Sequence, residues 1–262
     1  MGGKKYLVYG LILLLFGPVY SSQLSSQEIN HSVHSSSGKN IFFPFIKTLK
    51  QGHLVFQAGG YWSYQGKDQH IDIAGLIGDR FTITNHKDSN ALVGLGYFIS
   101  DKNSMNISYG LNGFYLPSTS VSGEVIQEDL FTNLSYRYKV THFPVYAVAK
   151  STIPLYSNKS SLVLNVGIGP NFMYLSDFKE RSIDDGVTLS DHAFLSHTRT
   201  TFSATAGIGF RLNQIFGNIP LECGYRFFYL GQGRFRPRTD QLLTSLSTGS
   251  TYANAVLCSI SV

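Results

Sequence analysis

The side chains best suited to hydrolytic chemistry lie in one polar segment, residues 176–198. His192 and His197 occur there with several serines and five carboxylates, namely Asp177, Glu180, Asp184, Asp185 and Asp191. A hydrolase of this kind needs a nucleophile, a histidine and a carboxylate held in one geometry. Nothing in the segment fixes such a geometry, and loops of this composition are ordinarily solvated. We therefore predict no catalytic residue and expect that the chain is not an enzyme.

Metal, cofactor and nucleic-acid chemistry have no better support. His31 and His34 stand in a serine-rich segment without a third ligand, whereas a zinc site needs three or four protein ligands. The Gly-x-Gly pairs that begin at Gly94, Gly167 and Gly207 lack the third glycine and the following helix of a dinucleotide site. No basic segment carries the interleaved aromatic residues of nucleic-acid modules. We predict no metal, no cofactor and no nucleic-acid partner.

The composition is poor in charge and rich in aromatic residues. Of the 262 residues, 14% are charged and 14% aromatic, whereas a soluble domain is about 25% charged. Residues 1–22 have the parts of a secretory signal peptide, with Lys4 and Lys5 before an apolar run and cleavage expected after Ser21 or Ser22. Residues 23–51 form a Ser-rich leader. No other stretch is apolar enough for a spanning helix, so membrane insertion must use strands.

Short alternating runs fill residues 52–262, and the segment Leu221–Gly231, LECGYRFFYLG, shows the pattern best. Successive side chains of a strand point to opposite faces. Leu221, Cys223 and Tyr225 therefore share an apolar face, opposite Glu222 and Arg226. Helical periodicity is absent from these runs.

Eight runs are clear strands, and two more, around His70 and from Phe143 to Ile153, are less regular. A loop is expected at 117–127, and long external loops are expected near 176–198 and 232–250. Both chain ends should lie at one rim, which requires an even number of strands. Ten strands are favoured and eight are the alternative.

The character of the two faces selects a membrane barrel over a lipocalin-like soluble barrel. Asn, Ser, Thr and Gly dominate the polar faces, whereas a water-exposed surface usually carries many Lys and Glu. Tyrosines recur near the ends of the apolar faces, as expected for belts at the membrane interfaces; they are Tyr97, Tyr115, Tyr138, Tyr174, Tyr229 and Tyr252. The predicted fold is an all-β, transmembrane, antiparallel up-and-down β-barrel with its apolar face toward lipid.

This architecture, with alternating strands, short turns at one rim and long loops at the other, resembles the small outer-membrane barrels of the opacity-protein and OmpX-like superfamily. The resemblance covers about residues 53–262 and rests on pattern. It implies a Gram-negative cell outer membrane, contact with outer-membrane lipid and lipopolysaccharide, and insertion by the barrel-assembly machinery. One departure is the C-terminus, Ser259-Ile260-Ser261-Val262, because that superfamily usually ends in an aromatic residue.

Five charged residues are assigned to the lumen by the strand phase: Arg137, Lys139, Arg211, Glu222 and Arg226. Buried charges must pair or stay wet. We predict that Glu222 pairs with one or more of the arginines to form a plug, and a basic selectivity filter is the alternative. The glycines of the Gly-x-Gly pairs should point inward and leave room for a large neighbouring side chain.

Two further groups of residues carry predictions. Arg234, Arg236 and Arg238 alternate, so in an extended chain they project to one side about 7 Å apart and can bind phosphates or sulfates; pairing with the acidic segment 176–198 is the alternative. Cys223 and Cys258 should lie at the same rim on neighbouring strands. A disulfide between them fits an oxidising periplasm, subject to its strict geometry.

These observations favour an outer-membrane surface protein, such as a surface antigen, with a side-chain-filled lumen. Its role is structural or is a contact between its loops and lipopolysaccharide or a host-surface ligand. The alternative is a small pore or conduit for small or hydrophobic solutes. The second alternative is a membrane-embedded, lipid-modifying enzyme.

Overall fold

The computed structural model describes residues 52–100, 106–155, 159–190, 192–216 and 219–262, with only the backbone described for 214–216. The expected signal peptide and the Ser-rich leader lie outside the described residues. None of the described residues belongs to a helix long and apolar enough to cross a membrane.

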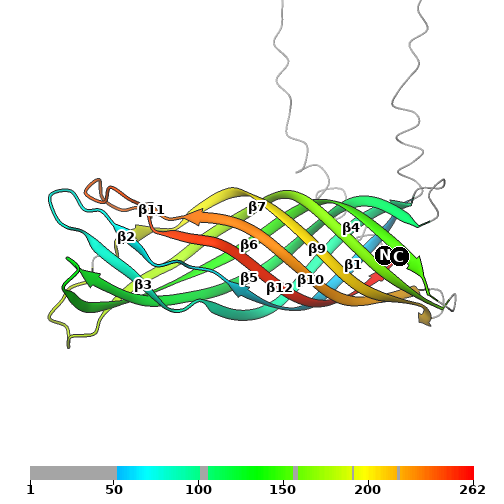
Figure 1. The fold of residues 1–262 in the computed structure, drawn as a ribbon, viewed down its shortest axis with the longest axis horizontal. Coiled ribbons are helices and arrows are strands. Elements are labelled where there is room, and N and C mark those ends of the chain that lie inside the picture. Colours follow the sequence, from blue (N-terminus) through cyan, green and yellow to red (C-terminus); the bar gives the residue numbers. More distant parts are fainter. Residues whose placement is uncertain (1–51, 101–105, 156–158, 191, 217–218) are drawn as a thin grey trace, which may run out of the picture. The chain divides into compact units, whose positions relative to one another are not determined.

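The described chain consists of antiparallel strands joined by turns and loops (Figure 1). In chain order they are β1 (Gly52–Tyr64), β2 (Gln69–Ile71), β3 (Asp79–Asn85), β4 (Lys87–Ser100), β5 (Ile107–Gln127), β6 (Phe131–Pro154), β7 (Ser160–Ser182), β8 (Phe194–Leu195), β9 (His197–Phe216), β10 (Ile219–Arg234), β11 (Arg236–Pro237) and β12 (Ser247–Ser261).

Ten of these strands share one sheet, and the sheet closes on itself. The ring runs β1-β4-β5-β6-β7-β9-β10-β12 and returns to β1, because β5 pairs with β6 and β12 pairs with β1. The short strands β2 and β3 add to the wall beside the outer end of β5. The predicted all-β, antiparallel up-and-down barrel is confirmed, with ten strands in the sheet and eight around the ring.

The two rims of the barrel differ in their connections. Leu54 and Val262 exchange backbone hydrogen bonds of 2.9 and 2.8 Å, so the start of β1 and the end of β12 lie at one rim. Short connections join β4 to β5, β6 to β7 and β9 to β10 at the same rim, whereas the other rim carries the longer loops. Outer-membrane barrels keep short turns on the periplasmic side, so the long-loop rim is the outer one.

Several predicted loops are strand in the structure. Residues 117–127 belong to β5, and the two strands expected at 130–140 and 143–153 are the single strand β6. The loop expected at 176–198 begins after Ser182, and the loop expected at 232–250 lies between Arg234 and Ser247. The physical reason is length, because β6 has 24 residues and roughly 10 suffice to cross a bilayer.

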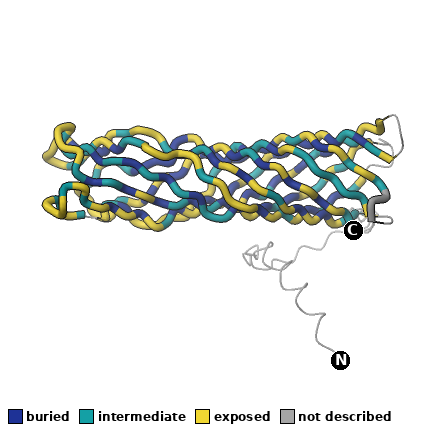
Figure 2. Tube along the Cα trace, turned by 90° about the horizontal axis from the view of Figure 1, so that it is seen from below, coloured by how far each residue is buried: buried dark blue, intermediate teal, exposed yellow. Residues whose placement is uncertain are grey.

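Burial alternates along the strands over the whole length of the barrel (Figure 2). In the part of the barrel next to the short-turn rim, here called the inner part, the side chains that point away from the lumen are apolar and exposed. Among them are Leu54, Phe56, Val93, Leu111, Val166, Ile168, Phe210 and Val256. In the outer part of β6, the apolar side chains of Leu134, Tyr136 and Tyr138 point inward instead. The barrel therefore has a lipid-facing inner part and an outer extension next to the long-loop rim. In the outer extension the apolar side chains face the lumen, as they do in a soluble barrel.

Buried side chains inside the barrel form two clusters. One cluster, here called the lower cluster, lies within the lipid-facing inner part and includes Phe98, Phe114, Tyr146 and Phe228. The upper cluster lies in the outer extension and contains, among others, Phe81, Tyr136, Tyr138, Phe178, Phe194 and Phe235. Edge-to-face ring contacts, such as Phe178 with Phe194 at 5.1 Å, hold the upper cluster together.

Candidate functional site

The charged group in the lower lumen is an ion pair between Lys150 of β6 and Glu222 of β10. The side chains are only 7% and 14% exposed. Glu222 was expected to pair with an arginine, and this prediction is wrong because its ion-pair partner is Lys150. Lys150 points inward because it shares the parity of Tyr146 and Val148 on β6. The pair crosses the lumen near the periplasmic rim.

Two predicted lumen arginines do lie on the inner face. Arg226 is 5% exposed and stacks over the ring of Phe114, with its guanidinium carbon 5.0 Å from the ring centroid. A cation over an aromatic face is stabilised by the ring quadrupole. Arg211 lies opposite Glu222 in the β9–β10 register, and its Nε donates to Asn213 Oδ1 at 3.1 Å.

The other two predicted lumen residues, Arg137 and Lys139, are outside the barrel, and this prediction is wrong. Arg137 is exposed and donates to Ser120 Oγ at 2.9 Å, and Lys139 forms a 2.9 Å ion pair with Asp177. The apolar face of this part of β6 does not meet lipid. It packs into the upper cluster, so the charged face points away from the lumen.

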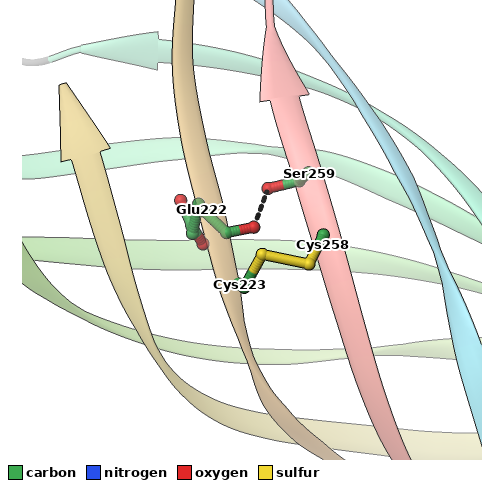
Figure 3. The surroundings of a disulfide bond; sticks show 4 residues. All are labelled: Glu222, Cys223, Cys258 and Ser259. Atoms are coloured by element: carbon green, nitrogen blue, oxygen red, sulfur yellow. Dashed lines mark hydrogen bonds between the residues drawn. A yellow bond between two sulfur atoms is a disulfide. The ribbon is translucent and has the colours of Figure 1, made fainter. Parts of the chain in front are cut away.

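The two cysteines lie directly opposite each other in the β10–β12 register and form a disulfide (Figure 3). Both are on the outward face of the wall. Beside the bond, Ser259 Oγ donates to the backbone oxygen of Glu222 at 3.5 Å. The bond thus fixes the register of the last strand next to the residue that forms the lumen ion pair.

The loops of the outer rim are joined by backbone hydrogen bonds. Ala74 N donates to Gln241 O at 2.8 Å, and Ile73 forms an isolated bridge with Leu242. Arg238 N donates to Ala193 O at 3.0 Å, which ties a third loop to the other two. The rim is therefore a continuous structure that can hold a cavity.

A cavity of about 570 Å³ opens among these loops. Its apolar lining includes Ile71, Leu76, Phe81, Phe131, Leu134 and Leu242, and its charged lining consists of Asp79, Glu128, Glu180 and Arg238. Small-molecule sites have this size and this mixture of apolar walls with a few polar groups. Phe81, Ile71 and Leu134 also belong to the upper cluster, so the cavity ends against packed side chains.

The three alternating arginines lie at the outer rim, and Arg238 also lines this cavity. Arg234, Arg236 and Arg238 are exposed, while Phe235 between the first two is 2% exposed and packs in the upper cluster. None of the ion pairs among the described residues joins these arginines to the acidic segment 176–198. The alternative of pairing with that segment has no support from the described part of the chain.

Of the residues considered for hydrolysis, Asp184 and Glu180 have different surroundings, and Asp191 lies outside the described residues. Asp184 accepts hydrogen bonds from Ser182 and Thr188, which hold its pKa at about 2, below the ordinary 3.8. Glu180 points inward and lines the cavity. Among the described residues, no group of three His, Cys, Asp or Glu side chains is placed to hold a metal ion.

Sequence reasoning missed Lys150 and the cavity. Lys150 stands in a run whose two faces are both partly apolar, so the phase there was undefined. If residues 131–154 are taken as one strand, the alternation that places Tyr138 inside the barrel also places Lys150 inside. This would have identified Lys150 as a lumen residue. The cavity has no local signal, because its lining comes from loops distant in sequence.

The fold and its surface define a class. A closed ring of strands with exposed aliphatic and aromatic side chains around its circumference is stable when lipid covers that surface. An outward apolar band with aromatic residues at its margins is the mark of outer-membrane barrels. The chain is an outer-membrane β-barrel protein.

Solved structures similar to this one include the outer membrane protein OprG of Pseudomonas aeruginosa, with a TM-score of 0.46, 12% identity and coverage of 80% of this chain and 96% of that chain. The outer membrane protein AlkL in lipid bilayers gives a TM-score of 0.42 and 13% identity over 90% and 97% of the two chains. Neisserial surface protein A gives 0.39 and 8% over 79% and 95%. No protein-family model and no curated protein matches the sequence.

Proposed function

We propose that the protein is a closed surface barrel that binds anionic saccharides through its outer rim. The partner class is the phosphorylated core of lipopolysaccharide or a sulfated host glycan. The observation that carries the proposal is the row of exposed arginines, Arg234, Arg236 and Arg238, on a rim that packed side chains hold in place. Guanidinium groups bind phosphate and sulfate through paired, charge-assisted hydrogen bonds.

The filled lumen supports a surface role over a pore. The two clusters, the Lys150–Glu222 pair and Arg226 occupy the inside of the barrel along the described strands. Small barrels are commonly filled by side chains in this way. Pure protein in planar bilayers should therefore show no steady conductance. A stable, ion-selective current would support the pore alternative and contradict the closed barrel.

Exposed apolar side chains at the rim also fit contact with a partner. Leu76, Ile77 and Phe131 are 61%, 62% and 65% exposed, and Val187 and Leu189 are 85% and 81% exposed. Such a group of large apolar side chains on loops commonly marks an interaction surface.

The arginine row is tested by binding of the folded protein to heparin, used as a sulfated probe. The variant R234Q/R236Q/R238Q should bind roughly tenfold more weakly or worse, because it loses three charge-assisted contacts. K67Q/K87Q/R199Q removes the same charge elsewhere on the exposed surface and serves as the matched control. Equal losses in both variants would mean that net charge, and not this row, determines binding.

A second function is favoured by the cavity, namely binding of a small, largely apolar molecule at the mouth. The cavity volume of about 570 Å³ and its apolar lining suit such a ligand. Ala193 lines the cavity, so Ala193→Trp should fill it and abolish binding of an apolar fluorescent probe such as N-phenyl-1-naphthylamine. Val187→Trp, at a fully outward position, should bind the probe like the wild type.

A further inference from the structure

The outward-facing surface of β6 and β7 changes from apolar to charged over a short distance. Phe143 lies opposite Phe172 in the register, and both side chains are 44% exposed. The next outward pair is Thr141 opposite Tyr174. These aromatic residues end the apolar surface of the two strands, which is where outer-membrane barrels meet the polar headgroups.

Cations begin directly beyond this aromatic margin. On β6 the next outward residues are Lys139 and Arg137, and on β7 they include Lys179 and Arg181. Lys139 is two residues past Thr141 and Arg137 is four, which is about 7 and 13 Å along the strand. This is the level of the lipid headgroups.

Two of these cations face each other. Arg137 and Lys179 are direct partners in the β6–β7 register, and both are exposed. Directly opposed side chains of like charge destabilise a sheet unless something neutralises them. Of the described residues, none forms an ion pair with Arg137, Lys179 or Arg181.

The carboxylates on this face offset only part of the charge. Asp177 forms an ion pair with Lys139 at 2.9 Å, and the nearby charge of Lys179 also lowers the pKa of Asp177. Glu124 lies opposite Ser135 and is thus diagonal to Arg137 across the β5–β6 register. Glu180 points inward to the cavity. Two outward carboxylates thus stand against the four cations, and an anion from outside can neutralise the excess.

We propose that Arg137, Lys179 and Arg181, the β6–β7 wall patch, bind the phosphate groups of outer-leaflet lipid. A phosphate between Arg137 and Lys179 removes their repulsion and accepts charge-assisted hydrogen bonds from both. The apolar wall below, with Phe143 and Tyr174, contacts the acyl chains of the same lipid. This site lies on the side of the barrel and is separate from the arginine row of the proposed function.

The test is native mass spectrometry of the full chain in neutral detergent, titrated with diphosphorylated lipid A. Wild-type protein should bind it, and R137Q/K179Q/R181Q should bind at least roughly tenfold more weakly. The matched control K67Q/K87Q/R199Q removes three other exposed positive charges and should bind lipid A like the wild type. Unboiled gel mobility verifies that each variant is folded.

Three results would overturn the proposal. The first is wild-type affinity in R137Q/K179Q/R181Q. The second is equal binding of dephosphorylated lipid A by the wild type, which would assign the affinity to the acyl chains. The third is displacement of lipid A by inorganic phosphate at the same concentration, which would make the patch a site for soluble anions.

A single substitution separates lipid binding from a structural role. Lys179→Gln removes the like-charge pair, so in lipid-free detergent its melting temperature should equal or exceed that of the wild type. Lipid A should raise the wild-type melting temperature and raise that of Lys179→Gln much less. A variant that melts lower than the wild type under both conditions would show that Lys179 acts only in folding.

Discussion

Lys150 and Glu222 form the only largely buried ion pair of the four among the described residues. A buried pair is a weak source of net stability, but removal of one partner leaves an uncompensated charge. The two side chains lie on β6 and β10, which are not neighbours in the ring, so the pair spans the lumen. Changes to this pair should therefore affect both the stability of the barrel and the closure of its lumen.

Removal of one partner of this pair should destabilise the barrel markedly. We expect Lys150→Met, or Glu222→Leu, to lower the free energy of unfolding by roughly 3 kcal/mol. The double variant K150M/E222L should recover most of the loss. Urea unfolding in phosphatidylcholine vesicles measures this, and additive losses in the double variant would contradict a direct pair.

Gly94 tests the packing of the lower lumen. A Cβ at this position would lie 2.6 Å from Cδ1 of Phe114, the ring beneath Arg226. Gly94→Ala should therefore displace Phe114 and cost roughly 1–3 kcal/mol. A Cβ added at Gly60 would meet no atom within 4 Å, so Gly60→Ala is the matched control and should change unfolding little.

At the scale of elements, β6 shows what sequence patterns can predict. The alternation of Tyr136, Arg137 and Tyr138 predicts a strand correctly, but it does not say whether the apolar face meets lipid or a core. Both environments select the same residues. The correct orientation depends on whether this stretch lies inside or beyond the bilayer, and that follows from the lengths of β5, β6 and β7 together.

The candidate sites were predictable to different degrees for the same reason. The strand phase placed Glu222, Arg226 and Arg211 on the inner face, because they lie in the parts of β9 and β10 that belong to the lipid-facing part of the barrel. It misplaced Arg137 and Lys139, which lie in the outer extension. The cavity depends on loop contacts such as Arg238 with Ala193, for which no short-range pattern exists.

The loop after β7 should keep its conformation into strong acid. Hydrogen bonds from Ser182 and Thr188 lower the pKa of Asp184 from 3.8 to about 2. A lowered folded-state pKa means that the stabilisation is present above pH 3.8 and is lost as the pH falls through about 2. The amide chemical shift of Thr188 should titrate with a midpoint near 2. A midpoint near 4 would contradict these hydrogen bonds, and Asp184→Asn should abolish the titration.

At the scale of the molecule, the barrel combines two designs in one wall. Its inner part has apolar residues outside, and its lumen holds both charged residues such as Glu222 and the aromatic residues of the lower cluster. Its outer extension has charged residues such as Arg137 outside and an aromatic cluster inside. The change occurs within single continuous strands, so the membrane boundary crosses each strand and does not fall between separate domains.

The disulfide should contribute to the stability of the whole ring. It closes a loop with a sequence separation of 35, for which the chain-entropy model gives roughly 4 kcal/mol. We expect C223S/C258S to unfold at lower urea concentration than the oxidised wild type and at the same concentration as the reduced wild type. A free-thiol count of two in the denatured, unreduced protein would contradict the bond.

The Cys223–Cys258 bond also sets how the barrel yields to mechanical force. When the two chain ends are pulled apart, β12 cannot peel from β10, because the bond carries the load between them. The 35-residue separation keeps roughly 12 nm of chain out of reach of the force. Single-molecule pulling should show that extra length only after reduction, with β1 as the first strand free to leave the oxidised barrel.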